Sequence, residues 1–224
     1  MPRMSSRALS GLMISLLPLT TAAQVTFVRF TFEDTTAAVV GSTLSLMSWN
    51  SGGAEGYANG FLDQGRALSV GNFQNGEYYQ LTLNAAGYTN LALDSFRSNG
   101  SAAAPKDWKI SYSLTGVAGT YVDASTYVLA SNNAVGTTTI AGLALPSGAN
   151  NNSSIVLRFT ATSSSRIDGT TSAANGTVRL DNISFTGTAI PEPATVGAIL
   201  GVAVLAFAAR RNRAKQKARQ MAGR

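Results

Sequence analysis

The chain has 224 residues and a formal net charge of +6, and it contains neither cysteine nor histidine. Without these residue types it has no thiolate metal ligand, no Ser-His-Asp triad and no histidine-ligated zinc site, which excludes most hydrolase mechanisms. The positive charge lies at the two ends of the chain, because residues 24–190 hold eight Lys and Arg against ten Asp and Glu. A nearly neutral middle without a basic stripe predicts that nucleic acid is not a partner.

The N-terminus has the composition of a secretory signal peptide. Two arginines precede a mostly apolar stretch over residues 8–19, and small residues follow at 21–23. This pattern predicts a signal peptide over residues 1–23, cut by signal peptidase between Ala23 and Gln24. The alternative is an uncleaved anchor, but a 12-residue apolar stretch is too short for a permanent membrane span.

Residues 24–188 are predicted to form one exported, all-β domain. Apolar and polar residues alternate in four short runs, at 28–32, 77–83, 108–114 and 155–159, and no stretch has sustained helical periodicity. A period of two gives each strand one buried face, as in an antiparallel sheet, so we expect a β-sandwich or jelly roll. The predicted buried positions are Val28, Phe30, Phe32, Tyr79, Leu81, Leu83, Trp108, Ile110, Tyr112, Leu114, Ile155, Leu157 and Phe159.

The last predicted strand changes phase in its middle. Val178 and Leu180 share one parity, whereas Ile183 and Phe185 share the other. A β-bulge near residues 181–182 would let both pairs point inward, because one extra residue reverses the alternation. The alternative is a strand that crosses from one sheet to the other.

Two segments, 108–116 and 178–185, resemble jelly-roll carbohydrate-binding modules and the related discoidin-like sandwiches. In many such modules, acids near the first and last strands hold a structural calcium ion. The resemblance therefore implies a possible calcium site at Glu33, Asp34 and Asp181, since carboxylate and carbonyl oxygens suit Ca²⁺. The alternative is that these acids cap turns or pair with neighbouring arginines. No other cofactor is expected.

Glycan binding would require exposed aromatic side chains, because sugar rings pack their C–H faces on aromatic rings. Trp108 alternates with Ile110 and is expected in the core instead. For each candidate the alternative is packing in the core or in a turn. The candidates, which lie in turn-rich segments or on the outer parity of a strand, are Trp49, Tyr57, Tyr78, Tyr88 and Tyr121.

A secreted carbohydrate-active enzyme is the alternative function, since glycosidases need only two carboxylates about 5 to 10 Å apart. None of the remaining acids forms a recognisable pair in the sequence. We therefore predict that the protein is not an enzyme and has no catalytic residues. The acids considered are Asp63, Glu77, Asp94, Asp107, Asp123 and Asp168.

The C-terminal segment, residues 189–224, has three parts: a Pro-Glu-Pro triplet at 191–193, an apolar run at 194–209 and a basic tail at 210–224. As a helix, 16 residues at about 1.5 Å each span about 24 Å, a little less than a typical bilayer core. We expect a transmembrane helix over 194–209. Because basic residues stay in the cytoplasm, the N-terminal side would be outside and the C-terminus inside.

This arrangement resembles the PEP-CTERM sorting signal of Gram-negative envelope proteins. The resemblance implies that an exosortase, a membrane-embedded protease, recognises the segment and removes the anchor, which releases the protein to the cell surface or extracellular matrix. The alternative is a permanent C-terminal anchor. The residues that would be recognised are Pro191, Glu192, Pro193, Arg210, Arg211 and Arg213.

These observations predict an exported surface or matrix protein with a structural or adhesive role and possible glycan binding. Its expected partners are signal peptidase, an exosortase-like protease, the inner membrane as a transient anchor, and extracellular polysaccharide. Two alternatives stay open: a secreted carbohydrate-active enzyme, and a binding domain that remains anchored at the surface.

Overall fold

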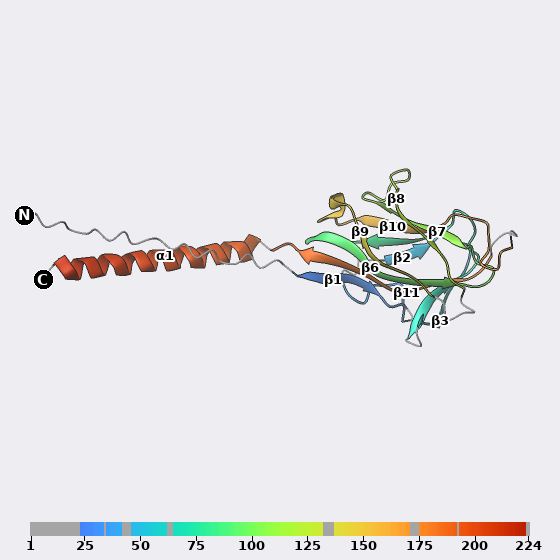
Figure 1. Ribbon diagram of the computed structural model, residues 1–224, viewed down its shortest axis with the longest axis horizontal. Coiled ribbons are helices and arrows are strands. Elements are labelled where there is room, and N and C mark those ends of the chain that lie inside the picture. The colour runs from blue at the N-terminus through green and yellow to red at the C-terminus, as the bar shows by residue number, and fades with distance from the viewer. Residues whose placement is uncertain are drawn as a thin grey trace, which may run out of the picture.

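The computed structural model describes residues 23–33, 35–41, 46–61, 65–131, 137–170, 175–191 and 193–222. The predicted signal peptide up to residue 22 and the candidate residues Asp34 and Glu192 lie outside these ranges. The described chain forms two antiparallel sheets packed face to face, followed by a C-terminal helix that extends away from them (Figure 1). The predicted all-β sandwich is therefore confirmed.

The first sheet has six strands, and β11 lies at its centre. Their order is β3-β4-β11-β6-β9, and β1 pairs with β11 beside β4. The strands are β1 (Gln24–Phe30), β3 (Glu55–Asn59), β4 (Arg66–Val70), β6 (Tyr88–Gly100), β9 (Thr138–Ala144) and β11 (Val178–Ala189).

The second sheet has five strands in the order β2-β5-β10-β7-β8. Its central strand β10 pairs in unbroken register with β5 on one side and β7 on the other. The strands are β2 (Leu46–Trp49), β5 (Tyr78–Leu83), β7 (Asp107–Ser113), β8 (Val122–Val128) and β10 (Ile155–Ala161).

The core lies between the two sheets and is built from the alternating apolar positions. Trp108 is 1% exposed and its indole N–H donates to the Pro105 carbonyl oxygen, so its predicted place in the core is confirmed. Phe96 of β6 stacks on Phe159 of β10, with ring centroids 4.8 Å apart, and so joins the two sheets. Phe27 is also buried, because the register of β1 shifts between Thr26 and Val28.

The predicted alternation of β7 is confirmed, although not every inward residue is fully buried. Tyr112 stands opposite the buried Leu157, and both Tyr112 and Leu114 are partly buried and pack against the core. Ser111 stands opposite the outward Arg158 and is itself buried on the outer face. The register between β7 and β8 shifts just after Ile110, but the pairing of β7 with β10 is unbroken.

The predicted bulge in the last strand is confirmed. The register between β11 and β6 shifts between Asp181 and Ser184, and Asn182 has a positive φ of 50°. Ile183 and Phe185 are consequently buried along with the residues before the bulge. The alternative, a strand that crosses between sheets, is wrong, because β11 stays in one sheet and only exchanges its neighbour β4 for β1.

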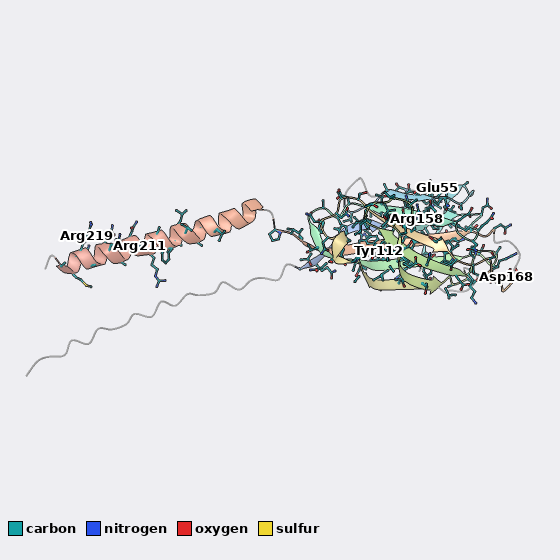
Figure 2. All side chains as sticks on the ribbon, turned by 90° about the horizontal axis from the view of Figure 1, so that it is seen from above. Glu55, Tyr112, Arg158, Asp168, Arg211 and Arg219 are labelled. Atoms are coloured by element: carbon teal, nitrogen blue, oxygen red, sulfur yellow. The ribbon has the colours of Figure 1, made fainter. Side chains whose placement is uncertain are left out.

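The C-terminal helix α1 (Pro193–Ala222) is longer than the sequence predicted. It continues past residue 209 through the basic tail, which is rich in the strong helix formers Ala, Arg, Lys and Gln. Its described side chains are exposed, including Arg211 and Arg219 (Figure 2). Among the residues that the structure describes, no helix is both long enough and apolar enough to cross a bilayer, so the predicted transmembrane helix over 194–209 is not confirmed.

Candidate functional site

The outer face of the five-stranded sheet carries an arginine held between two tyrosine rings. Arg158 lies between the buried residues Leu157 and Phe159 of β10, so the alternation of the strand directs its side chain outward. The guanidinium carbon lies 4.0 Å from the ring centroid of Tyr78 and 3.9 Å from that of Tyr121. Two of the five predicted aromatic residues are thus brought together by a cation that the sequence did not single out.

The order of the strands explains how these rings meet. Tyr78 begins β5, which lies beside β10, whereas Tyr121 precedes β8, which lies beyond β7. Ser111 of β7 stands opposite Arg158 in the register, and its small side chain is 3% exposed. A small residue at this position leaves space above β7 for the tyrosine ring to reach the guanidinium.

Gln80 orients the arginine from the neighbouring strand. It stands opposite Arg158 in the register, and its Oε1 accepts a hydrogen bond of 2.9 Å from the Arg158 Nε. The Tyr121 hydroxyl donates to the same oxygen at 3.4 Å. The terminal nitrogens of Arg158 form no hydrogen bond within the described residues, so they are available as donors.

At neutral pH the site carries the positive charge of Arg158 and a protonated Tyr121 hydroxyl. Burial raises the pKa of the Tyr121 hydroxyl above its ordinary value, although the nearby Arg158 charge lowers it. The hydroxyl therefore remains a neutral donor at pH 7. Contacts between a guanidinium and an aromatic face contribute about 0.5–1 kcal/mol each at exposed sites, so two of them hold the arginine in a defined orientation.

The other predicted aromatic residues lie elsewhere. Trp49 is partly buried and its indole N–H donates to the Gly53 carbonyl oxygen at 3.1 Å. The Tyr57 hydroxyl donates to the Glu55 carboxylate, and the Tyr88 ring stacks on Phe27 at a centroid distance of 4.8 Å. The structure does not gather these three residues into the site around Arg158.

The predicted calcium site contains one buried carboxylate. Asp181 is 1% exposed and accepts hydrogen bonds from the backbone N–H groups of Phe61 and Asn182, at 3.3 and 2.7 Å. Burial raises its pKa to about 6, opposed by these two hydrogen bonds, and the negative charge of Glu33 raises it further. Glu33 itself accepts from the Arg66 N–H at 3.0 Å.

These carboxylates do not by themselves make a metal cluster. The described residues contain no group of three or more acidic side chains that could hold a metal ion. A calcium ion between Glu33 and Asp181 would therefore need carbonyl oxygens as further ligands, or Asp34, which lies outside the described residues. The calcium site stays a prediction.

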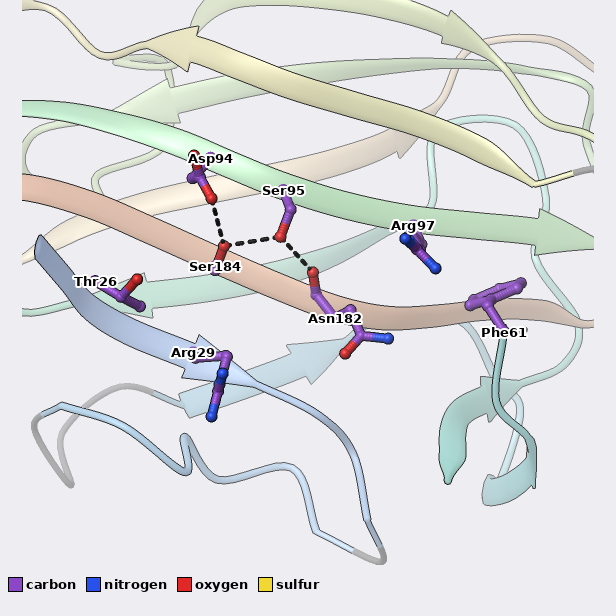
Figure 3. Close-up of a pocket in the computed structure, with 8 residues that line it drawn as sticks. All are labelled: Thr26, Arg29, Phe61, Asp94, Ser95, Arg97, Asn182 and Ser184. Carbon is purple, nitrogen blue, oxygen red and sulfur yellow. Dashed lines mark hydrogen bonds between the residues drawn. The ribbon is translucent and has the colours of Figure 1, made fainter. Parts of the chain in front are cut away.

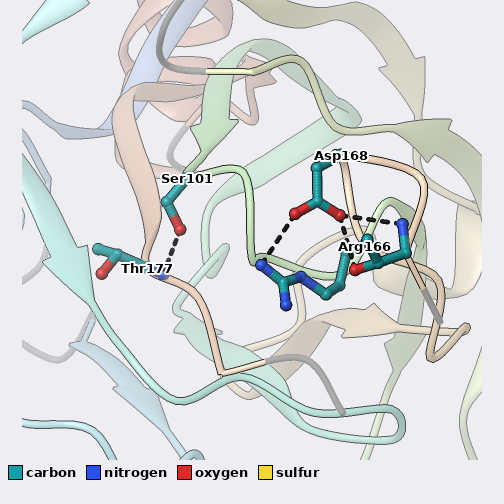
Figure 4. A network of polar contacts seen from close by, with 5 residues as sticks. Ser101, Arg166, Asp168 and Thr177 are labelled. Atoms are coloured by element: carbon teal, nitrogen blue, oxygen red, sulfur yellow. Dashed lines mark hydrogen bonds and ion pairs between the residues drawn. The ribbon is translucent and has the colours of Figure 1, made fainter. Parts of the chain in front are cut away.

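Several acids considered for catalysis have structural partners. Asp168 forms an ion pair of 2.8 Å with Arg166 and accepts from the backbone and side chain of Thr170 (Figure 4), and these hydrogen bonds lower its pKa. Asp123 pairs with Lys109 at 3.0 Å. The remaining acids have the following placements: Glu77 accepts from the Gln74 N–H, Asp94 accepts from Ser184, Asp107 begins β7, and Asp63 lies outside the described residues.

Residues 189–213 match the family described as the PEP-CTERM protein-sorting motif. The match includes the Pro-Glu-Pro triplet and the first three basic residues after the apolar run, and it confirms the resemblance noted in the sequence. The chain thus carries a sorting motif that implies export to the surface or envelope. No curated protein matches the chain.

Several solved β-sandwiches are similar to the structure. A cleaved adhesin domain of Lys-gingipain from Porphyromonas gingivalis has 13% identity and a TM-score of 0.46, covering 73% of this chain and 99% of that chain. The CBM22-2 xylan-binding domain from Paenibacillus barcinonensis Xyn10C has 13% identity and a TM-score of 0.47, covering 71% and 98%. Modules of a Clostridium thermocellum xylanase have 14% identity and a TM-score of 0.45, covering 75% and 29%. At such identities the similarity concerns the fold alone.

Proposed function

We propose that the protein is an exported surface or extracellular-matrix protein that binds a glycan on the outer face of its five-stranded sheet. The sorting motif at residues 189–213 supports the export. An exosortase-like protease would recognise this segment and separate it from the sandwich, and the β-sandwich would then act outside the cell in an adhesive or structural role.

The observation that carries the binding proposal is the convergence of four side chains, which we call the tyrosine–arginine face: Tyr78, Gln80, Tyr121 and Arg158. Each side chain is half-buried, so it is fixed and still reachable from solvent. Sugars present hydroxyl groups at their edges and C–H groups on their faces. The guanidinium and amide would bind the hydroxyls, while the exposed parts of the tyrosine rings would pack against the C–H groups.

This arrangement suits binding rather than turnover. None of the four side chains of the tyrosine–arginine face is a carboxylate, and Asp123 on the same sheet is paired with Lys109. A retaining or inverting glycosidase would need two carboxylates across one bond. The proposal therefore assigns recognition of a polysaccharide and no catalytic step.

Affinity electrophoresis tests the proposal. The full chain is run through gels that contain xylan, β-glucan or the extracellular polysaccharide of the producing cell, and its retardation is compared with that in plain gels. We expect retardation by at least one polysaccharide. Arg158→Gln removes the charge and the oriented donors, and should weaken binding at least tenfold, or about 1.4 kcal/mol.

A matched control is available on the other sheet. Arg66 also lies near a tyrosine ring, 5.8 Å from the centroid of Tyr57, so Arg66→Gln removes the same charge from a similar contact. This variant should bind as the unmodified chain does. Equal weakening by both variants, or no retardation by any polysaccharide, would contradict glycan binding at the tyrosine–arginine face.

A further inference from the structure

The outer face of the six-stranded sheet has a hollow of about 540 Å³ beside the bulge of β11 (Figure 3). It forms where β11 exchanges neighbours: pairing with β4 ends at Leu180, and pairing with β1 begins at Ile183. The buried ring of Phe61, from the connection between β3 and β4, lines one side. We call this site the bulge hollow. It lies on the opposite sheet from the tyrosine–arginine face and is independent of it.

A fixed set of polar groups lines the bulge hollow. The Ser95 hydroxyl donates to the Asn182 carbonyl oxygen at 2.9 Å and lies 2.7 Å from the Ser184 hydroxyl. Ser184 in turn donates to Oδ2 of Asp94 at 3.2 Å. The dashed lines in Figure 3 follow this chain from Asp94 to Asn182. The hydroxyl protons of Ser95 and Ser184 are used in these hydrogen bonds. The Asp94 carboxylate is exposed, and its other oxygen, Oδ1, can accept a hydrogen bond from a ligand.

Two guanidinium groups complete the lining. Arg29 comes from β1 and Arg97 from β6, and both line the hollow together with the bulge residue Asn182. Among the described residues, neither guanidinium has a hydrogen-bonding or ion-pairing side chain. The lining residues themselves hold two cations and the Asp94 carboxylate, and the Arg97 charge also acts on the buried Asp181 carboxylate next to the hollow. The planar guanidinium fork matches the geometry of a carboxylate.

We propose that the bulge hollow binds an acidic sugar, namely a hexuronate unit of a polysaccharide. The arginines would hold the sugar carboxylate, Asp94 would accept a hydrogen bond from a ring hydroxyl, and Phe61 would offer an apolar wall for the ring. An inorganic anion would be repelled by the Asp94 carboxylate and would offer no ring to pack against Phe61. A neutral sugar would offer the two guanidinium groups no carboxylate to bind. The combination of charges therefore selects a ligand with both a carboxylate and hydroxyl groups.

Isothermal titration of the full chain with a galacturonate trisaccharide tests this inference. Two comparison ligands are used: inorganic phosphate, and the neutral galactose trisaccharide, which has the same ring hydroxyls but a hydroxymethyl group in place of each carboxylate. We expect the galacturonate trisaccharide to bind at least tenfold more tightly than either. The Arg29→Gln, Arg97→Gln double variant should lose this preference. Added salt should weaken the binding of the acidic trisaccharide more than the binding of the neutral one.

Further variants test whether the preference for the acidic sugar depends on the bulge hollow itself. Lys106 is exposed on a loop, and Lys106→Gln, a single charge removal, should leave the preference intact. Arg29→Lys keeps the charge but loses the fork, and should keep only part of the affinity. The inference is overturned if phosphate binds as tightly as the acidic trisaccharide, or if the double variant binds as the unmodified chain does. Loss of the preference in Arg158→Gln instead would move the site to the tyrosine–arginine face and also overturn it.

Discussion

The β-sandwich and the helix α1 differ in how far their side chains are buried. The sandwich encloses large side chains such as Tyr79 and Trp108 almost completely, whereas the described side chains of α1 are exposed. Stability therefore resides in the packing between the two sheets, and α1 adds no buried surface of its own described side chains. The segment at 189–213 instead carries its information as a linear motif. A binding site requires the folded sandwich, whereas a sorting motif requires only the order of its residues.

The largest loss of stability is expected when the aromatic ring that joins the two sheets is removed. Phe159 is fully buried and stacks on Phe96, with ring centroids 4.8 Å apart. Phe159→Ala leaves a cavity at this contact and should lower the free energy of unfolding by about 3–5 kcal/mol, measured by denaturant titration. The exposed Val128, on an edge strand of the same sheet, provides the control, and Val128→Ala should change stability by less than about 0.5 kcal/mol. Similar losses in both variants would contradict the proposed core.

The next largest effect is a pH dependence of the free energy of unfolding, which arises from Asp181. Folding raises the pKa of this carboxyl from 3.8 to about 6, mainly through burial. Between those values the unfolded chain releases the proton while the folded chain retains it, so stability should fall as pH rises from about 4 to about 6. The loss amounts to about 3 kcal/mol. Free energies of unfolding at several pH values, measured with a chelator present, should show this decline, and Asp181→Asn should flatten it. An unchanged slope in the variant would assign the decline to other groups.

The predicted calcium ion would act on the same residue in the opposite direction. Bound near Glu33 and Asp181, it would favour the ionised carboxylates, so calcium should raise the melting temperature at pH 7 more than at pH 4. At a free concentration 100 times the dissociation constant the gain would be about 2.7 kcal/mol. Asp181→Asn should remove this response. A melting temperature that does not change on chelation at pH 7 would exclude the calcium site.

The smallest effect is expected from removing α1. A chain that stops at Pro191 keeps every residue of β11, which ends at Ala189, and loses only exposed described side chains. Its free energy of unfolding should match that of the full chain within about 0.5 kcal/mol, as for other surface changes. A cooperative loss of stability would show that α1 packs on the sandwich and would break the contrast between the two regions.

The sequence predicts the features that depend on local order. Alternation places Tyr79, Leu81 and Ile155 in the core, and the change of parity around Asp181 reveals the bulge. The sorting motif is likewise a local pattern. The hydropathy pattern predicts too early an end for the helix, because a drop in hydropathy after residue 209 does not stop a segment of strong helix formers.

The binding sites depend on strand order, which the sequence does not reveal. Tyr78 and Tyr121 were both candidates, but their meeting on Arg158 requires β5, β10, β7 and β8 to lie side by side in that order. The outward parity of Arg158 and of Gln80 was visible in the alternation. Their pairing across two strands was not, because it is set by the register of β5 with β10.

The intact mass of the protein recovered from the cell surface and the medium tests the central claim most directly. The account predicts a species that begins at Gln24 and ends between residues 191 and 193, with or without the mass of an attached group. That mass would show that the sandwich is delivered outside and that the C-terminal segment serves only as its address. A species that extends to Arg224, found only in the membrane fraction, would contradict this account and would make the protein a permanently anchored surface domain.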